Sequence, residues 1–192
     1  MKCIIGLGNI GKEYEDTRHN LGFMAADYLC KKYNITGEKK KKKYVYSEGM
    51  INGEKIAIIK PTTYMNLSGE AIVEALNWYK ITPKDILVIY DDIDIPLGEV
   101  RYRLSGSSGT HNGMRNIIST IKTEDFARIR IGMENRCGLP IPLIDYVLQK
   151  FSKEELTKIE NEIMPVVEEN VVEFLTTKWN NVKIIRYSVW IG

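Results

Sequence analysis

The chain has 192 residues, a length that fits one domain with a sizeable core. Hydrophobic residues make up 44% of the sequence and charged residues 27%, and the formal net charge of +2 excludes bulk electrostatic selection of a partner. The three widely spaced cysteines favour a reducing, cytosolic environment and argue against structural zinc. No apolar stretch has the length of a signal peptide or a membrane span, so we expect a cytoplasmic protein that does not enter membranes.

Hydrophobic periodicity predicts strands and helices that alternate along the chain. The predicted strands are residues 3–7, 44–50, 55–59, 86–90, 99–104 and 127–131, and the predicted helices are residues 21–33, 69–79 and 112–121. Asn52-Gly53 separates two of the strands and indicates an antiparallel hairpin. Ser68 is the expected N-cap of the second helix. Ser152 and Glu155 match a capping box that opens a long C-terminal helical region, which Pro165 should kink or divide.

This alternation predicts the α/β class. We expect residues 1–192 to form a single three-layer domain, with a mixed, mostly parallel central sheet flanked by helices. No internal repeat or low-complexity linker suggests a domain boundary.

Residues 6–11 satisfy the glycine pattern of dinucleotide-binding proteins and follow a predicted strand. The pattern lacks its context, because no apolar helical face opens at Gly11 and Lys31-Lys32 stands where the ribose-binding acid should be. We interpret it instead as a glycine-rich turn that lets the backbone approach a ligand and displays Asn9 at the end of the first strand.

The strand at residues 86–90 runs directly into three carboxylates, Asp91, Asp92 and Asp94. Ligands bind at the carboxyl ends of strands in open α/β sheets, so Asp91 is well placed to enter a site. For Asp92 and Asp94 we expect solvated turn positions. A divalent-metal site has little support, because no phosphate loop or second set of carboxylates accompanies the cluster.

Residues 60–69 join a strand end to the start of a helix. If that strand runs parallel to the first, the connection presents Tyr64, Met65 and Asn66 at the same edge of the sheet. Taken alone, Met65 would more often be a core residue and Asn66 a turn residue.

Two further segments carry polar or basic residues. The polar loop at residues 104–113 offers backbone N–H groups to an anion or a substrate carbonyl, although a surface connector fits equally. Arginines recur at two-residue spacing on two strands, which suits contact with phosphates: Arg101, Arg103, Arg128 and Arg130. The lysine run at residues 39–43 is expected to be a solvated loop, with RNA contact as the alternative.

The chain contains only two histidines, His19 and His111, and each precedes an asparagine in a short polar stretch. Histidine is the natural general base of an enzyme without a metal, so one of these two is the expected base of any acid–base chemistry. By its residues alone the sequence does not choose between them.

Several of these segments together closely resemble bacterial peptidyl-tRNA hydrolases, in order and over nearly the whole chain. The segments are residues 6–9, 17–22, 60–69, 91–98 and 109–113, continued by residues 128–132 and 146–151. The resemblance implies a monomeric α/β enzyme without a cofactor, a metal or an obligate protein partner. Its implied substrate is peptidyl-tRNA, whose ester bond between the peptide and the terminal ribose is hydrolysed.

The resemblance also implies roles for individual residues. His19 is the implied catalytic base and Asp91 the carboxylate that orients it. The implied substrate-binding residues are Asn9, Tyr14, Tyr64, Met65, Asn66 and Asn112, and the implied contacts to tRNA phosphates are Arg101, Arg103 and Arg130. His111 stands in a matching segment without an evident acid, and we interpret it as structural or as a substrate contact.

The chain departs from the resemblance in two places. Ser105, Ser107 and Ser108 stand in a loop that is often richer in glycine. Pro165 and the apolar ending at residues 187–192 put a basic C-terminal contribution to tRNA binding in doubt, and we expect the ending to pack on the body or on a neighbouring molecule.

Two other functions are compatible with such a scaffold. One is a non-catalytic RNA-binding protein, which would not require His19 and Asp91 together. The other is a nucleotide-dependent α/β enzyme, which thermal stabilisation by NAD or ATP would support.

Overall fold

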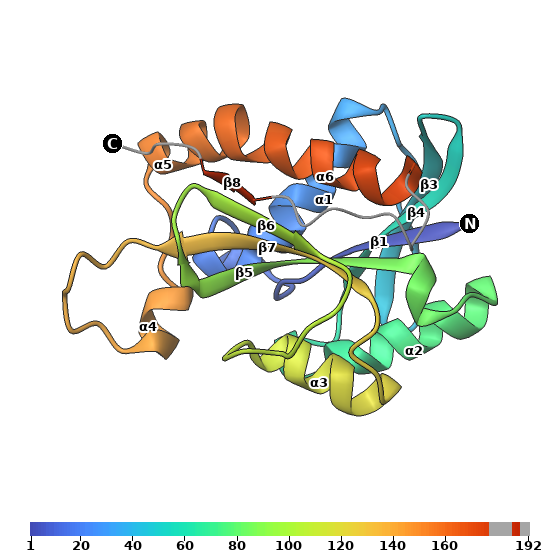
Figure 1. Ribbon diagram of the computed structural model, residues 1–192, viewed down its shortest axis with the longest axis horizontal. Helices are drawn as coiled ribbons and strands as arrows, with labels where there is room; N and C mark the ends of the chain where they lie inside the picture. The colour runs from blue at the N-terminus through green and yellow to red at the C-terminus, as the bar shows by residue number, and fades with distance from the viewer. Residues whose placement is uncertain (177–185, 189–192) are drawn as a thin grey trace.

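A sheet runs through the middle of the molecule, and the computed structural model describes residues 1–176 and 186–188 of the chain (Figure 1). In that part of the chain the sheet has eight strands in the order β2-β3-β4-β1-β5-β7-β6-β8. Their bounds are β1 Lys2–Gly6, β2 Lys39–Lys40, β3 Tyr44–Ile51, β4 Glu54–Pro61, β5 Ile86–Pro96, β6 Glu99–Arg103, β7 Ala127–Glu134 and β8 Arg186–Ser188.

The directions of these strands confirm the prediction of a mixed, mostly parallel sheet. β1 pairs in parallel with β4 and β5, and β5 pairs in parallel with β7. The pairs outside this centre are antiparallel, including the predicted hairpin of β3 and β4 around Asn52-Gly53. Among the described strands, β3 and β6 alone run against the others. The carboxyl ends of the central strands therefore share one edge.

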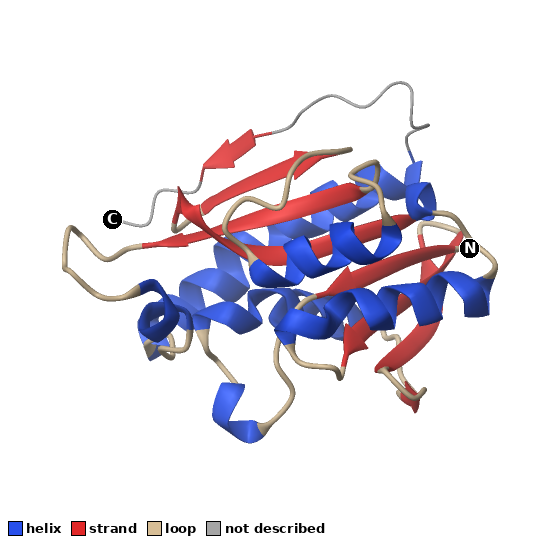
Figure 2. Ribbon diagram, turned by 90° about the horizontal axis from the view of Figure 1, so that it is seen from below, coloured by secondary structure: helices blue, strands red, loops and turns tan. Residues whose placement is uncertain are grey.

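Helices cover both faces of the sheet and complete the predicted three layers (Figures 1 and 2). The α-helices are α1 Leu21–Lys32, α2 Ser68–Tyr79, α3 Asn112–Ile121, α4 Leu143–Val147, α5 Lys153–Lys158 and α6 Met164–Thr176. α1 and α6 pack on one face, and α2 and α3 pack together on the other. Short 3-10 turns precede several elements: η1 Lys12–Tyr14, η2 Arg18–Asn20, η3 Met65–Leu67 and η4 Pro83–Asp85. No helix in the described ranges has the length and apolarity to cross a bilayer.

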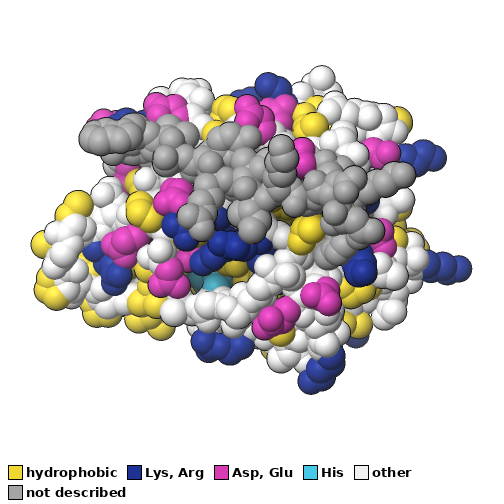
Figure 3. All heavy atoms as spheres, in the orientation of Figure 1, with side chains coloured by type: hydrophobic (Ala, Val, Ile, Leu, Met, Phe, Trp, Pro, Cys, Tyr) yellow, Lys and Arg dark blue, Asp and Glu magenta, His cyan; other side chains and the backbone are white. Residues whose placement is uncertain are grey.

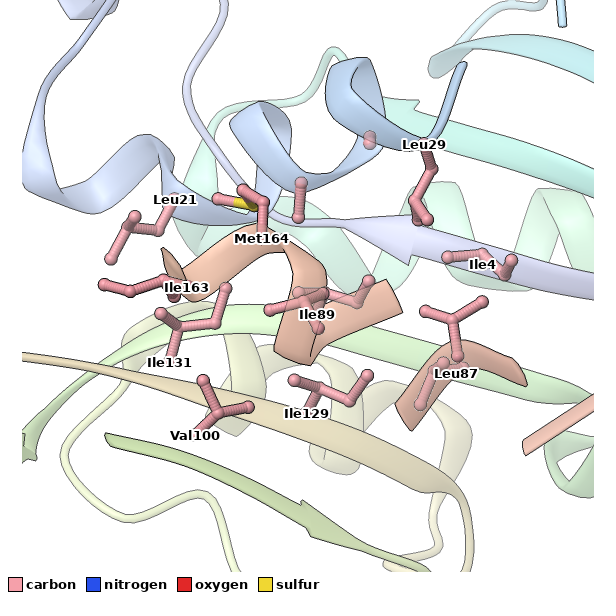
Figure 4. Close-up of a cluster of buried hydrophobic side chains, with 14 of the residues drawn as sticks. Ile4, Leu21, Leu29, Leu87, Ile89, Val100, Ile129, Ile131, Ile163 and Met164 are labelled. Atoms are coloured by element: carbon pink, nitrogen blue, oxygen red, sulfur yellow. The ribbon is translucent and has the colours of Figure 1, made fainter. Parts of the chain in front are cut away.

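Alternate residues of the central strands form the two cores. Ile4 of β1 faces α1 and α6, while its neighbours Cys3 and Ile5 face α2 and α3. Figure 4 shows the first core, where Ile89 and Ile129 of the sheet lie beneath α1 and α6. Each such fully buried aliphatic side chain contributes about 1.5–3 kcal/mol. Because both faces of the central strands are buried, these strands are continuously apolar in sequence, which made them predictable.

Two glycines let α1 lie directly against the strands. A Cβ on Gly22 would meet Ile89 O at 2.3 Å and Leu7 N at 2.4 Å, and one on Gly6 would meet Gly22 O at 2.1 Å. Gly8 faces the ring of Phe23 in the same way. The interpretation of this segment as a turn whose glycines approach a ligand is therefore wrong at Gly6 and Gly8, which make room for the helix. The contact fixes where α1 begins, and with it the preceding turn η2.

The central strand β5 is longer than predicted. β5 continues through Asp91 and Asp92, which pair with Ile131 and Gly132 of β7, and ends at Pro96. Asp92 is buried, so its prediction as a solvated turn residue is wrong. Asp94 is exposed as expected, but it lies in β5 instead of a turn. Carboxylates weaken a strand signal, but here a neighbouring strand supplies the hydrogen bonds.

Of the helix and loop predictions, two change, at Ser68 and at Lys39-Lys40. Ser68 is the first residue of α2, and its hydroxyl donates to Met65 O at 2.8 Å instead of capping the helix.

The capping box of Ser152 and Glu155 is confirmed. Pro165 is the second residue of α6 and follows a π-helical turn, η5 Ile159–Ile163. This position suits proline, which cannot donate a helical hydrogen bond.

Lys39 and Lys40 form the short exposed strand β2 at one edge of the sheet instead of a loop. The predicted packing of the C-terminal ending involves residues 189–192, which lie outside the described part of the chain.

Candidate active site

His19 and Asp91 meet at the carboxyl edge of the sheet. His19 lies in η2 immediately before α1, and Asp91 lies on β5 beyond the last residue of β1. The Nδ1 atom of His19 is 2.8 Å from Asp91 Oδ2. The carboxylate is 1% exposed, whereas the imidazole side chain retains 14% exposure. A buried carboxylate thus holds one nitrogen of a ring that solvent still reaches.

His111 lies on the other side of the same carboxylate. Its Nε2 atom is 3.1 Å from Asp91 Oδ1, and its Nδ1 accepts a hydrogen bond from Met114 N at 3.1 Å as the N-cap of α3. The N–H of Met114 requires a lone pair on Nδ1, so the proton of this ring is on Nε2 and is donated to Asp91. The expectation that His111 lacks an acidic partner is wrong, because Asp91 accepts from both rings.

The two contacts set the protonation of Asp91 and His19. Burial alone would raise the pKa of Asp91, but His19 and His111 outweigh burial and hold its pKa below the usual range. Burial lowers the pKa of His19, but the charge and the hydrogen bond of Asp91 outweigh it and raise that pKa above the ordinary value. Asp91 is therefore ionised, and His19 is a stronger base than a free imidazole.

Asn9 lies beside this pair and is held by three hydrogen bonds. Its Oδ1 accepts from Met65 N at 2.9 Å, its backbone N–H donates to Asn20 Oδ1 at 2.8 Å, and its carbonyl accepts from Asn20 Nδ2 at 3.0 Å. Because Oδ1 is used as an acceptor, the Nδ2 group is left as a donor on a side chain that lines the cavity. Asn20, which the sequence analysis did not single out, fixes this orientation. The one feature of the sequence that could have indicated Asn20 is its position directly after His19.

These residues line a cavity of about 430 Å³, a size that suits part of a chain or a small ligand. Nine of the lining residues are polar, namely Asn9, His19, Tyr64, Asn66, Asp91, Asp92, Thr110, His111 and Asn112. Seven are apolar, namely Met65, Ile93, Met133, Leu143, Ile144, Val147 and Leu148. Four of the apolar residues come from α4 and the residue after it, and Ile144 is 70% exposed. These four residues were not among the predicted site residues, because α4 is too short for helical periodicity to indicate it.

The predicted substrate-binding residues fall on different parts of the site. Tyr64 and Asn66 are exposed beside the buried Met65, on a connection in which Tyr64 has φ 57°. Asn112 is exposed at the start of α3, and its Oδ1 accepts from Arg115 Nη1 at 3.2 Å. Tyr14 is not among the residues that line the cavity. Its carbonyl accepts from Thr17 Oγ1 at 2.8 Å and so supports the turn before His19.

The predicted arginines lie on neighbouring strands next to the cavity, where basic side chains gather beside a histidine (Figure 3). Arg101 of β6 is directly opposite Arg130 of β7, so the two side chains share a face. Arg130 Nε donates to Asp92 Oδ2 at 2.6 Å, and Arg103 lies further along β6. Arg128 is 1% exposed and donates to Gly106 O and Ser107 O. Arg128 thus holds the polar loop instead of offering its charge to phosphate.

The cluster of His19, Asp91 and His111 also has the composition of a metal site, with donor atoms within 4.8 Å of one another. Both ring nitrogens that face Asp91 are hydrogen-bond donors in the arrangement above. A divalent ion would have to displace both protons and the hydrogen bonds that they make.

The chain matches the family described as peptidyl-tRNA hydrolase over residues 3–188. It is similar to a peptidyl-tRNA hydrolase of Clostridium botulinum, at 47% identity over 96% of this chain and 99% of that protein. A peptidyl-tRNA hydrolase of Bacillus cereus strain Q1 is 49% identical over 85% of this chain and 87% of its own length.

Among solved structures, the fold is similar to that of a peptidyl-tRNA hydrolase from Acinetobacter baumannii. The two share 32% sequence identity and superpose with a TM-score of 0.75, over 93% of this chain and 96% of that one. The family match spans the sheet from Cys3 to Ser188 and all the residues that line the cavity, and with the similarity to these members it shows that the chain belongs to the peptidyl-tRNA hydrolase family.

Proposed function

We propose that this protein hydrolyses the ester between the peptide and the terminal ribose of peptidyl-tRNA, using water activated by His19. One observation carries the assignment of the base: the 2.8 Å contact between His19 Nδ1 and the buried Asp91, at the edge of the cavity. Family membership supports the reaction class. The products are the free peptide and tRNA that can be aminoacylated again.

His19 acts as the general base. The Nδ1–H group of His19 donates a hydrogen bond to Asp91, which leaves the lone pair on Nε2 to take a proton from the attacking water. The carboxylate also stabilises the imidazolium that forms, because it remains ionised beside the ring. Such a base contributes about 10²–10⁴-fold to a rate. His111 cannot take this role, since both of its ring nitrogens already make hydrogen bonds.

Amide groups around the base bind the substrate. The Nδ2 group of Asn9 is directed by the contacts of its oxygen, and it is a suitable donor to the ester carbonyl as negative charge develops. Asn66 and Asn112 flank the same cavity and supply further amides for the peptide backbone and the tRNA end. Met65 and Tyr64 line the path of the peptide, whereas a contact of Tyr14 with substrate remains a prediction.

The phosphates of the tRNA are negatively charged, and no lysine or arginine is among the described residues that line the cavity. Arg101, Arg103 and Arg130 lie on the neighbouring strands β6 and β7, which supports a role for them as contacts to tRNA phosphates. Action as a monomer, without a cofactor and in the cytoplasm, also remains a prediction.

The decisive experiment measures release of labelled peptide from an N-blocked aminoacyl-tRNA. We expect the wild-type protein to release the peptide with and without EDTA, and His19→Ala to lose at least about 10²-fold in kcat because the base is absent. Lys12→Ala, an exposed substitution, is the matched control and should keep full activity. Near-normal turnover by His19→Ala would contradict the assignment of the base, and loss of activity in EDTA would contradict metal independence.

The same assay distinguishes a non-catalytic RNA-binding protein. Such a protein would bind the labelled substrate without releasing peptide, whether or not His19 is present. The second candidate, a nucleotide-dependent enzyme, has lost its main support because Gly6 and Gly8 pack against α1.

A further inference from the structure

Arg18 lies immediately before the proposed base and is buried in an aromatic cluster. Only 8% of the residue is exposed. Its guanidinium carbon lies 4.6 Å from the ring centroid of Tyr146 and 4.6 Å from that of Phe151. Its Nη2 donates to Glu155 Oε1 at 3.0 Å, while Nε and Nη1 are buried without a partner among the described residues. A cation held mainly by ring faces and one carboxylate depends on the position of both rings.

The backbone around Arg18 is attached to the same distant segment. Arg18 N donates to Gln149 O at 3.0 Å, and Phe151 N donates to Asp16 O at 2.9 Å, around an antiparallel bridge between Thr17 and Lys150. Residues 16–18 and 149–151 therefore form a short antiparallel ladder. The Arg18 side chain adds a contact with the Phe151 ring to this ladder. η2, which carries His19, begins at this ladder.

Tyr146 connects the Arg18 side chain to the central sheet. Its hydroxyl donates to Met133 O at 2.7 Å and accepts from Asn135 N at 2.9 Å, near the end of β7. Tyr146 is also part of α4, whose neighbouring residues line the cavity. Arg18 thus connects the turn of His19 to β7 through one ring. β7 is the strand that pairs with β5, where Asp91 lies.

We propose that Arg18 is a positioning residue of the reaction: clamped between Tyr146 and Phe151, it holds the turn of His19 at the distance from Asp91 that general-base catalysis requires. This inference rests on the proposed function of His19. Arg18 acts through the His19–Asp91 contact and touches no substrate. It is not among the residues that line the cavity.

The test compares Arg18→Met in two backgrounds. Methionine keeps the apolar length of the side chain but removes the planar cation. We expect it to lower kcat by about 10²-fold, with a smaller change in KM, because displacement of a catalytic group by about 1 Å has this effect. In an Asp91→Asn background the contact that Arg18 supports is already altered, so the same substitution should lower kcat far less.

Two further variants guard against a folding defect. Phe151→Leu removes one ring and leaves Arg18 in place, and it should lower kcat in the same background-dependent way. Lys2→Met is the matched control: Lys2 lies over the Phe174 ring and bonds Phe174 O at 2.6 Å, at the start of β1 and away from the site. It should leave kcat unchanged in both backgrounds, even if it lowers the melting temperature.

A readout without substrate separates this inference from the proposed function. In an NMR titration of His19, Arg18→Met should lower the pKa of the ring, because a loosened contact with Asp91 no longer raises it. An unchanged titration, or an equal proportional loss of kcat in both backgrounds, would overturn the positioning role. If His19→Ala were fully active while the titration still moved, the proposed function would fail and the link from Arg18 to His19 would stand.

Discussion

Asp91 accepts a hydrogen bond from each of two histidines, and the rings differ in what their second nitrogen does. In His111 it accepts from the backbone of α3, whereas in His19 it lies on a side chain that lines the cavity. The carboxylate therefore serves one ring that is fixed and one that can react. This difference, and not the distance to Asp91, distinguishes the proposed base.

Asp91→Asn should change both the rate and its pH dependence. Activity needs neutral His19, so it falls as pH drops through the raised pKa of that ring. Asparagine removes the charge that raises the pKa and leaves burial, which lowers it. We expect a lower maximal kcat/KM and an acid limb displaced to lower pH, measured between about pH 5 and 9. An acid limb that stayed in place would show that another group controls the profile.

Substitutions at His111 separate its two contacts. His111→Ala removes the N-cap of α3 and the donor to Asp91, and it should lower the free energy of unfolding by about 1 kcal/mol from the cap alone. His111→Asn retains a capping acceptor but is too short to keep the donor. Chemical denaturation should rank the asparagine variant as the more stable one. Both should raise the pKa of His19, since Asp91 then shares its charge with one ring only. Equal stability of the two variants would argue against the cap.

At the scale of elements, the position of the base depends on how closely α1 lies on β1 and β5. Gly22 permits a helix-to-strand contact with no side chain between the backbones. Gly22→Ala should therefore lower the free energy of unfolding by about 3 kcal/mol, through overpacking that neither backbone can relieve. It should also lower kcat, because the shift moves η2. Lys32→Ala on the exposed side of α1 is the control for thermal and kinetic measurements, and its effect should be small.

The helices and strands differ in how well the sequence predicted them. Elements with local signals were confirmed, such as the Asn52-Gly53 hairpin and the apolar strand at Ile86. The extension of β5 through Asp91 was not predicted, because its hydrogen bonds come from β7, which is distant in sequence. The pairing of His111 with Asp91 was missed for the same reason. Resemblance indicated His19, but only tertiary geometry shows what His111 does.

For the whole molecule, a small net charge means that affinity for RNA must come from a local patch. Arg103→Ala should raise KM for full-length peptidyl-tRNA and lower the salt dependence of log(kcat/KM) by about one unit of slope, because one phosphate contact is lost. A peptidyl ester of the terminal nucleoside lacks those phosphates and should be unaffected. The exposed Lys84→Ala is a control from another part of the surface. An equal effect of Arg103→Ala on both substrates would place Arg103 at the ester instead.

The clamp around Arg18 has a consequence for when activity arises during synthesis. His19 and Asp91 are separated by 72 positions, and Arg18 and Glu155 by 137. A nascent chain that is exposed only as far as Asp91 contains the base and its carboxylate but not the residues that clamp the turn. Catalytic competence should therefore appear late, after the segment beyond α4 has left the ribosome. The enzyme would then gain its power to cleave peptides from tRNA only after its own synthesis has passed Glu155.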